Sequence, residues 1–292
     1  MRLRRSSIET PGITRRRRGT GFSYEDVAGQ PVRDEETLQR IRALAIPPAW
    51  EEVWICPDPA GHIQAAGADA AGRRQYLYHA GWRVRRDAEK FDRMLTFARA
   101  LPRLRERVAG DLSLRGMPKD KALACAVRLL DQGFFRVGSE SYTKQNGSFG
   151  LATLRKEHVK VQRDRIVFDF KAKSGVRRVQ AVHDPTVAPL VRTMKLRRSG
   201  GRELLAYREG RRWRDVRSSD INEYVRDAAG GEYTTKDFRT WHGTVLAAVF
   251  LATADKDTNT NGSTSRKRIV SSSIREVAGY LGNTPAVARA SY

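Results

Sequence analysis

The sequence predicts an α+β protein in which a small β-rich N-terminal domain precedes a larger, mostly helical domain that carries a three-stranded β meander. Short strand-like runs at residues 52–56, 62–65 and 75–79 are separated by turns rich in Pro and Gly. Beyond Arg83, apolar residues recur at helical spacing, and residues 158–182 read as three consecutive strands. We therefore expect three segments: a flexible basic arm at 1–20, the β-rich domain at 21–82 and the mostly helical domain at 83–292.

The expected arm is dense in positive charge. Residues 1–18 hold seven arginines against a single acid, Glu9, and Pro11-Gly12 breaks any helix. Such a run is either a solvated tail without specific contacts or an arm that lies along phosphates.

In the β-rich domain, Asp34 is placed to cap one helix, which Pro47-Pro48 would stop. The strand-like runs that follow carry Arg73, Arg74 and Tyr76, which we expect to face nucleic acid. The alternative is that the aromatic alternation only fills the core.

The larger domain is predicted to begin with helices at 83–107 and 119–132. The meander contains a tight turn at 171–175, where Gly175 suits a positive φ, and helices are expected to dominate from Asp184 onward. Thr234-Thr235-Lys236-Asp237 has the form of a capping box and predicts a helix start.

The C-terminal segment is predicted to contain a loop and two helices. A polar run at 253–265 suggests the loop, and 269–281 the penultimate helix. Gly282 suits a helix C-terminus, and Thr284 followed by Pro285 suits the start of the last helix, which would deliver Tyr292.

Composition points to a polyanionic partner. The formal net charge is +22 and the pI is near 10.7, with Arg and Lys in every segment, so nucleic acid is the natural partner. Cys56 and Cys125 lie far apart, and the five histidines lack ligand-like spacing, which argues against a disulfide framework and a zinc site. No apolar run spans a bilayer and no secretory leader is visible, so we expect no membrane contact and a cytoplasmic, nucleoid-associated location.

Five side chains in distinctive surroundings are the candidate site. Taken singly each is a weak signal, because an isolated Arg in so basic a protein is more often a surface charge and most tyrosines only pack. They are Arg136 in Phe-Phe-Arg-Val-Gly-Ser-Glu, Lys173 in Lys-Ala-Lys-Ser-Gly, Arg239 in Lys-Asp-Phe-Arg-Thr-Trp-His-Gly-Thr, Asn283 in Leu-Gly-Asn-Thr-Pro-Ala, and Tyr292.

Together and in this order, these motifs resemble the type IB DNA topoisomerases, particularly their small bacterial and viral branch. The resemblance covers about Phe22 to Tyr292, and its strongest pieces are residues 236–241 and 282–292. It implies the catalytic fold that type IB topoisomerases share with tyrosine recombinases. It also implies a monomer that closes around double-stranded DNA as a basic clamp and relaxes supercoils without ATP, metal or another cofactor.

The resemblance implies a role for each residue of the site. Tyr292 would attack a phosphodiester to give a 3′-phosphotyrosyl bond, and religation would follow strand rotation. Arg136 and Arg239 would bind the nonbridging oxygens, where charge builds up. Lys173 would protonate the leaving 5′-oxygen, unless it or Lys171 only contacts phosphate. Asn283 stands where many relatives have His, and its amide can still donate.

Lys171 and Lys236 are further expected DNA contacts. His242 stands where relatives often have Gly, which a helix tolerates. Family members continue past the nucleophile, so a carboxylate on Tyr292 is expected to repel the scissile phosphate, and a helical extension to raise activity. Two alternatives stay open: a tyrosine recombinase, against which Lys-Asp-Phe-Arg-Thr-Trp argues, and a DNA-binding protein without catalysis.

Overall fold

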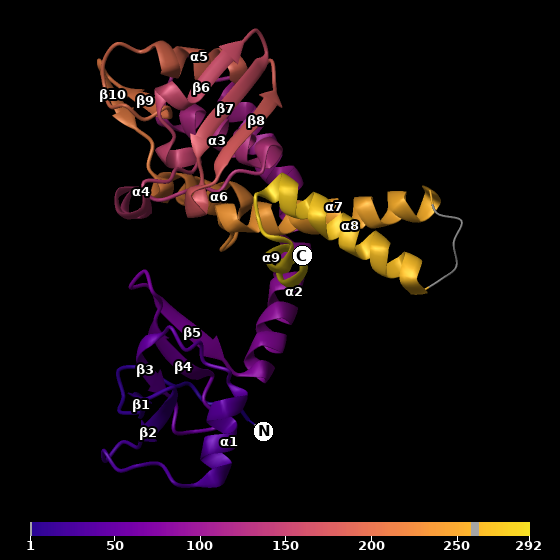
Figure 1. Cartoon of the computed structure of the whole chain (residues 1–292). Coiled ribbons are helices and arrows are strands. Elements are labelled where there is room, and N and C mark those ends of the chain that lie inside the picture. Colours follow the sequence, from indigo (N-terminus) through magenta and orange to yellow (C-terminus); the bar gives the residue numbers. More distant parts are fainter. Residues whose placement is uncertain (1, 258–262) are drawn as a thin grey trace. The chain divides into compact units, whose positions relative to one another are not determined.

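The chain forms two compact units, Met1–Asp92 and Arg93–Tyr292. The computed structural model describes residues 2–257 and 263–292, without the side chains of 254–265. Helix α2 (Ala80–Leu112) carries the chain from the first unit into the second (Figure 1). The first unit is rich in strands and the second is mostly helical, which confirms the predicted α+β class. No helix among the described residues is both long and apolar enough to cross a membrane.

The first unit is an antiparallel five-stranded sheet with one helix, α1 (Glu35–Ala43). Asp34 caps α1 as predicted, because its carboxylate accepts from the Thr37 backbone N–H at 2.8 Å. Ile41 of this helix packs on sheet residues such as Ile55 to form a small core. In sheet order the strands are β2 (Gly21–Glu25), β1 (Ile13–Arg18), β3 (Glu51–Ile55), β4 (Ile63–Ala68) and β5 (Arg74–Tyr78).

The prediction of a flexible arm at residues 1–20 is wrong, because β1 lies inside this sheet between β2 and β3. Ile13 is buried and starts the strand, and the arginines that follow are mostly exposed. Arg15 donates to the Pro47 carbonyl at 3.1 Å and lies over the Phe22 ring. Positive charge on the solvent face leaves backbone pairing intact, so the arginine run forms a strand.

The second unit contains a three-stranded antiparallel sheet in the order β6-β7-β8, on which some of its helices pack (Figure 1). This sheet confirms the predicted meander. Its core includes Phe97, Leu129, Phe168 and Met194, all fully buried. The elements of this unit are α3 (Lys119–Gly133), α4 (Glu140–Asn146), β6 (Val159–Gln162), β7 (Arg165–Lys171), β8 (Arg177–His183), α5 (Val187–Leu196), β9 (Ala206–Glu209), β10 (Arg212–Asp215), α6 (Ser218–Ala229), α7 (Thr235–Asp257), α8 (Ser263–Leu281) and α9 (Pro285–Ser291).

Two parts of the second unit differ from the prediction. The hairpin β9–β10 was not expected, since arginines and Gly210 obscure the alternation of its short strands. The predicted loop at 253–265 is too long, because α7 continues to Asp257 and α8 begins at Ser263, while 258–262 lie outside the described residues. A polar sequence does not by itself stop a helix, which explains the error.

Candidate active site

Arg136 is placed by a sharp exit from α3. The helix ends at Gly133, and Phe134 then takes a left-handed conformation with φ of 53°. The Arg136 carbonyl accepts from the Leu151 N–H at 2.8 Å, which pairs its segment with the turn that follows α4. A Cβ on Gly150 would lie 2.7 Å from that carbonyl oxygen. The close approach therefore requires glycine at 150.

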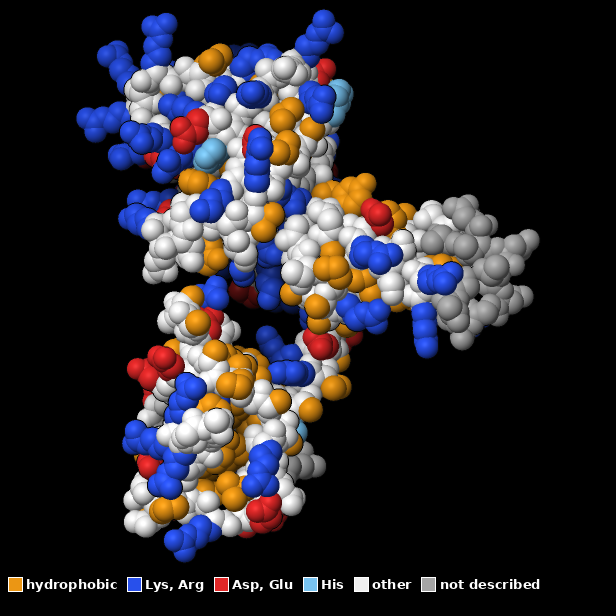
Figure 2. Space-filling view, viewed as in Figure 1, with side chains coloured by type: hydrophobic (Ala, Val, Ile, Leu, Met, Phe, Trp, Pro, Cys, Tyr) orange, Lys and Arg blue, Asp and Glu red, His pale blue; other side chains and the backbone are white. Residues whose placement is uncertain are grey.

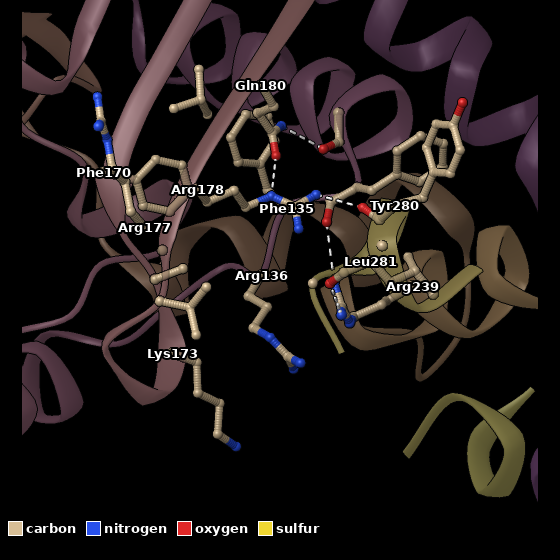
Figure 3. Close-up of a pocket in the computed structure, with 18 of the residues that line it drawn as sticks. Phe135, Arg136, Phe170, Lys173, Arg177, Arg178, Gln180, Arg239, Tyr280 and Leu281 are labelled. Carbon is tan, nitrogen blue, oxygen red and sulfur yellow. Dashed lines mark hydrogen bonds between the residues drawn. The ribbon is translucent and has the colours of Figure 1, made fainter. Parts of the chain in front are cut away.

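The Lys173 hairpin is fastened to the same turn. The Phe149 N–H donates to the Lys171 carbonyl at 2.8 Å, one residue before Gly150. Ser174 and Gly175 have φ of 65° and 77°, so the chain reverses tightly between β7 and β8, and Gly175 has the predicted positive φ. Lys173 itself is exposed, and its side chain points into the same open space as Arg136 (Figure 3).

Arg239 lies near the start of α7 and is buried, at 8% exposure. The Asp237 carboxylate accepts from the Thr234 N–H at 2.7 Å, which fixes the helix start, and also pairs with Arg93. Arg239 donates to the Phe134 carbonyl at 3.1 Å and to the Leu281 carbonyl. The guanidinium therefore joins the segments that follow α3 and α8.

Asn283 brings the two arginines together. Gly282, with φ of 60°, ends α8, and Thr284 caps α9 by accepting from Val287 N–H, as predicted. Between them, Asn283 Oδ1 accepts from Arg136 at 2.5 Å and from Arg239 at 3.0 Å. Two guanidinium groups thus converge on one oxygen atom.

Tyr292 follows α9 and lies against α7. A Cβ built on Gly243 would stand 2.5 Å from Tyr292 Cε1 and 2.7 Å from its Cγ, so the ring rests directly on the glycine backbone. The ring also packs on a small cluster that includes Leu281 and Ala288. Since Gly243 is one helical turn beyond Arg239, the tyrosine and the arginine are neighbours.

Positive charge concentrates at this point. The pKa of Arg239 is lowered to about 10, mainly by burial and also by the nearby charges of Arg136 and Arg178, while Tyr292 acts in the opposite direction. In the described part of the chain, neither Arg136 nor Arg239 pairs with an Asp or Glu side chain. Desolvated cations that crowd each other favour an anion between them.

Two cavities meet at these residues. The larger, about 620 Å³, lies between β8 and the end of α8, and the smaller, about 290 Å³, lies beside the Arg136 segment. Both are lined by Arg136, Lys173 and Arg239, and Lys236 lines the smaller. Asn283 accepts from both arginines and Tyr292 lies beside Arg239, so the structure brings together all five residues of the predicted site.

The other predicted DNA contacts fall into two groups. Lys171 and Lys236 are exposed close to the site. Arg73, Arg74 and Tyr76 belong to the first unit, at the start of β5 and just before it. Tyr76 is 39% exposed and stacks on Tyr78, so the strand aromatics do not fill the core.

Basic side chains are spread over the visible face of each unit, with fewer acidic ones among them (Figure 2). Some of the predicted contacts already have acidic neighbours. Arg73 pairs with Asp69 at 2.8 Å, and Arg74 lies 3.7 Å from Glu52. Exposed pairs of this kind are weak, so phosphate can compete for these arginines.

Sequence reasoning missed Gly243 and Arg178. A glycine in the interior of a helix is a signal of close packing, and it was available at Gly243. Arg178 carried no such signal, because arginine is common throughout the chain. Among the described residues, no group of three or more His, Cys, Asp or Glu side chains is arranged to hold a metal ion.

The chain is similar to known proteins over most of its length. The sequence model of the eukaryotic DNA topoisomerase I catalytic core matches residues 79–291, and that of the bacterial DNA topoisomerase IB N-terminal domain matches residues 21–69. DNA topoisomerase 1B of Acanthamoeba polyphaga mimivirus is 32% identical over 96% of this chain and 84% of its own length. DNA topoisomerase I of Monkeypox virus is 22% identical over 90% of this chain and 81% of its own.

A solved structure of the XerH site-specific recombinase bound to its difH substrate has a TM-score of 0.42 at 11% identity, covering 66% of this chain and 49% of that one. The matched catalytic core and the mimivirus relative define the class of protein as a DNA topoisomerase, an isomerase. This chain belongs to the type IB DNA topoisomerase family.

Proposed function

We propose that this protein relaxes supercoiled double-stranded DNA by transient cleavage of one strand through Tyr292. The observation that carries the proposal is the convergence of Arg136 and Arg239 on a single oxygen of Asn283, with Tyr292 held one helical turn away. An anionic phosphate oxygen can replace the amide oxygen as acceptor. The guanidinium groups then meet the charge that develops as the phosphorus is attacked.

Each residue has a separate task in the proposed reaction. The Tyr292 hydroxyl gives up its proton to water, and its oxygen forms a bond to phosphorus as the bond to the 5′-oxygen breaks, leaving a 3′-phosphotyrosyl link and a free 5′-hydroxyl. Lys173 donates the proton that the departing oxygen needs. Asn283 Nδ2 makes no hydrogen bond within the described residues, so it is available to a nonbridging oxygen.

Reversal of these steps reseals the strand after rotation. Because the phosphodiester energy is kept in the covalent link, the cycle as proposed uses no ATP. Lys171, Lys236, Arg73, Arg74 and Tyr76 contribute contacts to the phosphate backbone in this account. Such contacts hold the duplex without reading its sequence.

The test is relaxation of supercoiled plasmid in EDTA without ATP. We expect the intact chain to change the linking number, and Tyr292→Phe to lose this activity while it keeps salt-sensitive DNA binding. Tyr233→Phe is the matched control, since its hydroxyl makes no hydrogen bond in the described part of the chain. If the unmodified chain binds DNA but does not relax it, the proposal is wrong and the chain is a DNA-binding protein without catalysis.

A further inference from the structure

Two side chains of β8 connect the segments that carry the site. We propose that Arg178 and Gln180 are positioning residues that hold the Arg136 and Asn283 segments in register with each other and with the Lys173 hairpin. This inference rests on the proposed strand cleavage, since it concerns the geometry of that reaction. Neither side chain needs to touch the DNA.

Gln180 holds the segment that leads to Arg136. Its Nε2 donates to the Gly133 carbonyl at 2.6 Å, at the end of α3 and shortly before Arg136. Phe134, the next residue, is in the left-handed conformation, so a hydrogen bond at Gly133 fixes where that turn begins. Gln180 therefore fixes the start of the Arg136 segment against β8.

Arg178 holds the segment that leads to Asn283. Its guanidinium donates to the Tyr280 carbonyl at 2.6 Å, at the end of α8 and shortly before Asn283. The same guanidinium donates to Gln180 Oε1, so the two side chains form a continuous bridge (Figure 3). The bridge runs from the end of α3 through β8 to the end of α8.

The half-buried Arg178 is packed closely on the side that faces the end of α8. A Cβ on Gly282 would collide with Arg178 Nη1, so the glycine that ends α8 lies directly against the guanidinium. Burial lowers the pKa of Arg178, and the nearby Arg136 lowers it further. Burying a cation costs free energy, and a fully exposed arginine or lysine would give the surface the same charge without that cost. The partial burial of Arg178 therefore indicates a specific task for its guanidinium.

The backbone pairing of β8 also extends to the hairpin that carries Lys173. Arg178 lies beside Arg177, which pairs with Lys171 across the hairpin that carries Lys173. The same strand therefore sets the distance from Lys173 to both ends of the bridge. Misplacement of a reacting group by about 1 Å can cost about 10²-fold in rate.

The experiment measures single-turnover cleavage of a nicked DNA substrate and, separately, the Kd for DNA. We expect Arg178→Ala to lower the cleavage rate by about 10²-fold with little change in Kd, because its loss displaces reacting groups and leaves backbone contacts intact. Arg178→Lys is expected to stay impaired, since an ammonium cannot fork onto two acceptors. Gln180→Ala is expected to lower the rate in the same way.

Two comparisons separate positioning from general loosening of the fold. Arg177→Ala removes the same charge from the same strand, but this side chain points away from Arg136 (Figure 3). It pairs with Asp169 on the surface, so we expect a wild-type rate. In an Arg136→Ala background, Arg178→Ala should cost much less than it does alone, because one acts through the other. Circular dichroism and thermal melting check that each variant is folded.

Three results would overturn the inference in a chain that still relaxes plasmid. They are a wild-type cleavage rate for Arg178→Ala, a wild-type rate for Arg178→Lys, and additive losses when Arg178→Ala is combined with Arg136→Ala. An intact chain that forms no covalent adduct would overturn the proposed function, and the inference with it. The two failures are therefore distinguishable.

Discussion

Replacing Gly243 by alanine adds one methyl group at the point where the Tyr292 ring rests on α7. The new Cβ would stand 2.5 Å from Tyr292 Cε1 and 2.7 Å from Cγ, whereas carbon atoms in contact prefer about 3.5–4.0 Å. The ring must therefore move by about 1 Å. A shift of this size in a reacting group can cost about 10²-fold in rate.

The substitution leaves the rest of the protein intact or improves it. Alanine is favoured over glycine in a helix by about 1 kcal/mol, so α7 should be no less stable. Gly110→Ala in α2 is the matched control, because a Cβ there meets nothing within 4 Å. Both variants make the same chemical change in a helix, and only one of them meets the tyrosine.

The assay is single-turnover formation of the covalent protein–DNA adduct, separated on a denaturing gel. We expect Gly243→Ala to form the adduct about 10²-fold more slowly and Gly110→Ala to match the unmodified chain. Equal rates for all three proteins would refute the placement of the Tyr292 ring on Gly243.

Three further predictions concern the charges and buried groups. Burial opposes ionisation of Asp131, but hydrogen bonds from His242 and Arg105 outweigh it and lower the pKa from 3.8 to about 2. This ionisation stabilises the fold above about pH 4 and the effect is lost as pH falls toward 2, so Asp131→Asn should destabilise by about 2 kcal/mol at pH 7 and by little at pH 2 in denaturant titrations. Lys173→Ala should slow cleavage of ordinary DNA but recover on a substrate with a bridging 5′-sulfur, a leaving group that needs no proton; no recovery would mean that Lys173 only contacts phosphate. Burial raises the pKa of Cys125 to about 12, so a thiol reagent at pH 8 should leave it unmodified in the folded protein and label it after unfolding; rapid labelling of the folded chain would contradict its burial.

Local signals in the sequence predicted much of this fold. Asp34, Gly282 and Thr284 mark helix ends because their side chains or backbone freedom act on the nearest turn, and the structure confirms all three. The arm at 1–20 failed for a different reason. Whether an arginine run becomes a strand depends on the β2 and β3 partners on either side of it, which no local pattern records.

The candidate site likewise combines features that local sequence predicts with features that depend on long-range packing. Its five residues were identified by their motifs, and the structure brings them together. Their hydrogen bonds could not be foreseen: Asn283 receives both arginines through its oxygen, and Arg178 joins the site by reaching a carbonyl more than a hundred positions along the chain. Contacts of that kind depend on how β8 and α8 pack, and one arginine among many gives no sign of them.

The central claim is that Tyr292 takes one strand of DNA as a covalent 3′-phosphate ester. The most direct measurement is to trap the adduct in EDTA on a substrate whose cut 5′ end diffuses away, digest the protein, and identify the modified peptide by mass spectrometry. The account predicts a nucleotide linked through its 3′-phosphate to Tyr292, in the peptide that follows Arg289. A link to another residue or to a 5′-phosphate, or no adduct from the active chain, would contradict it.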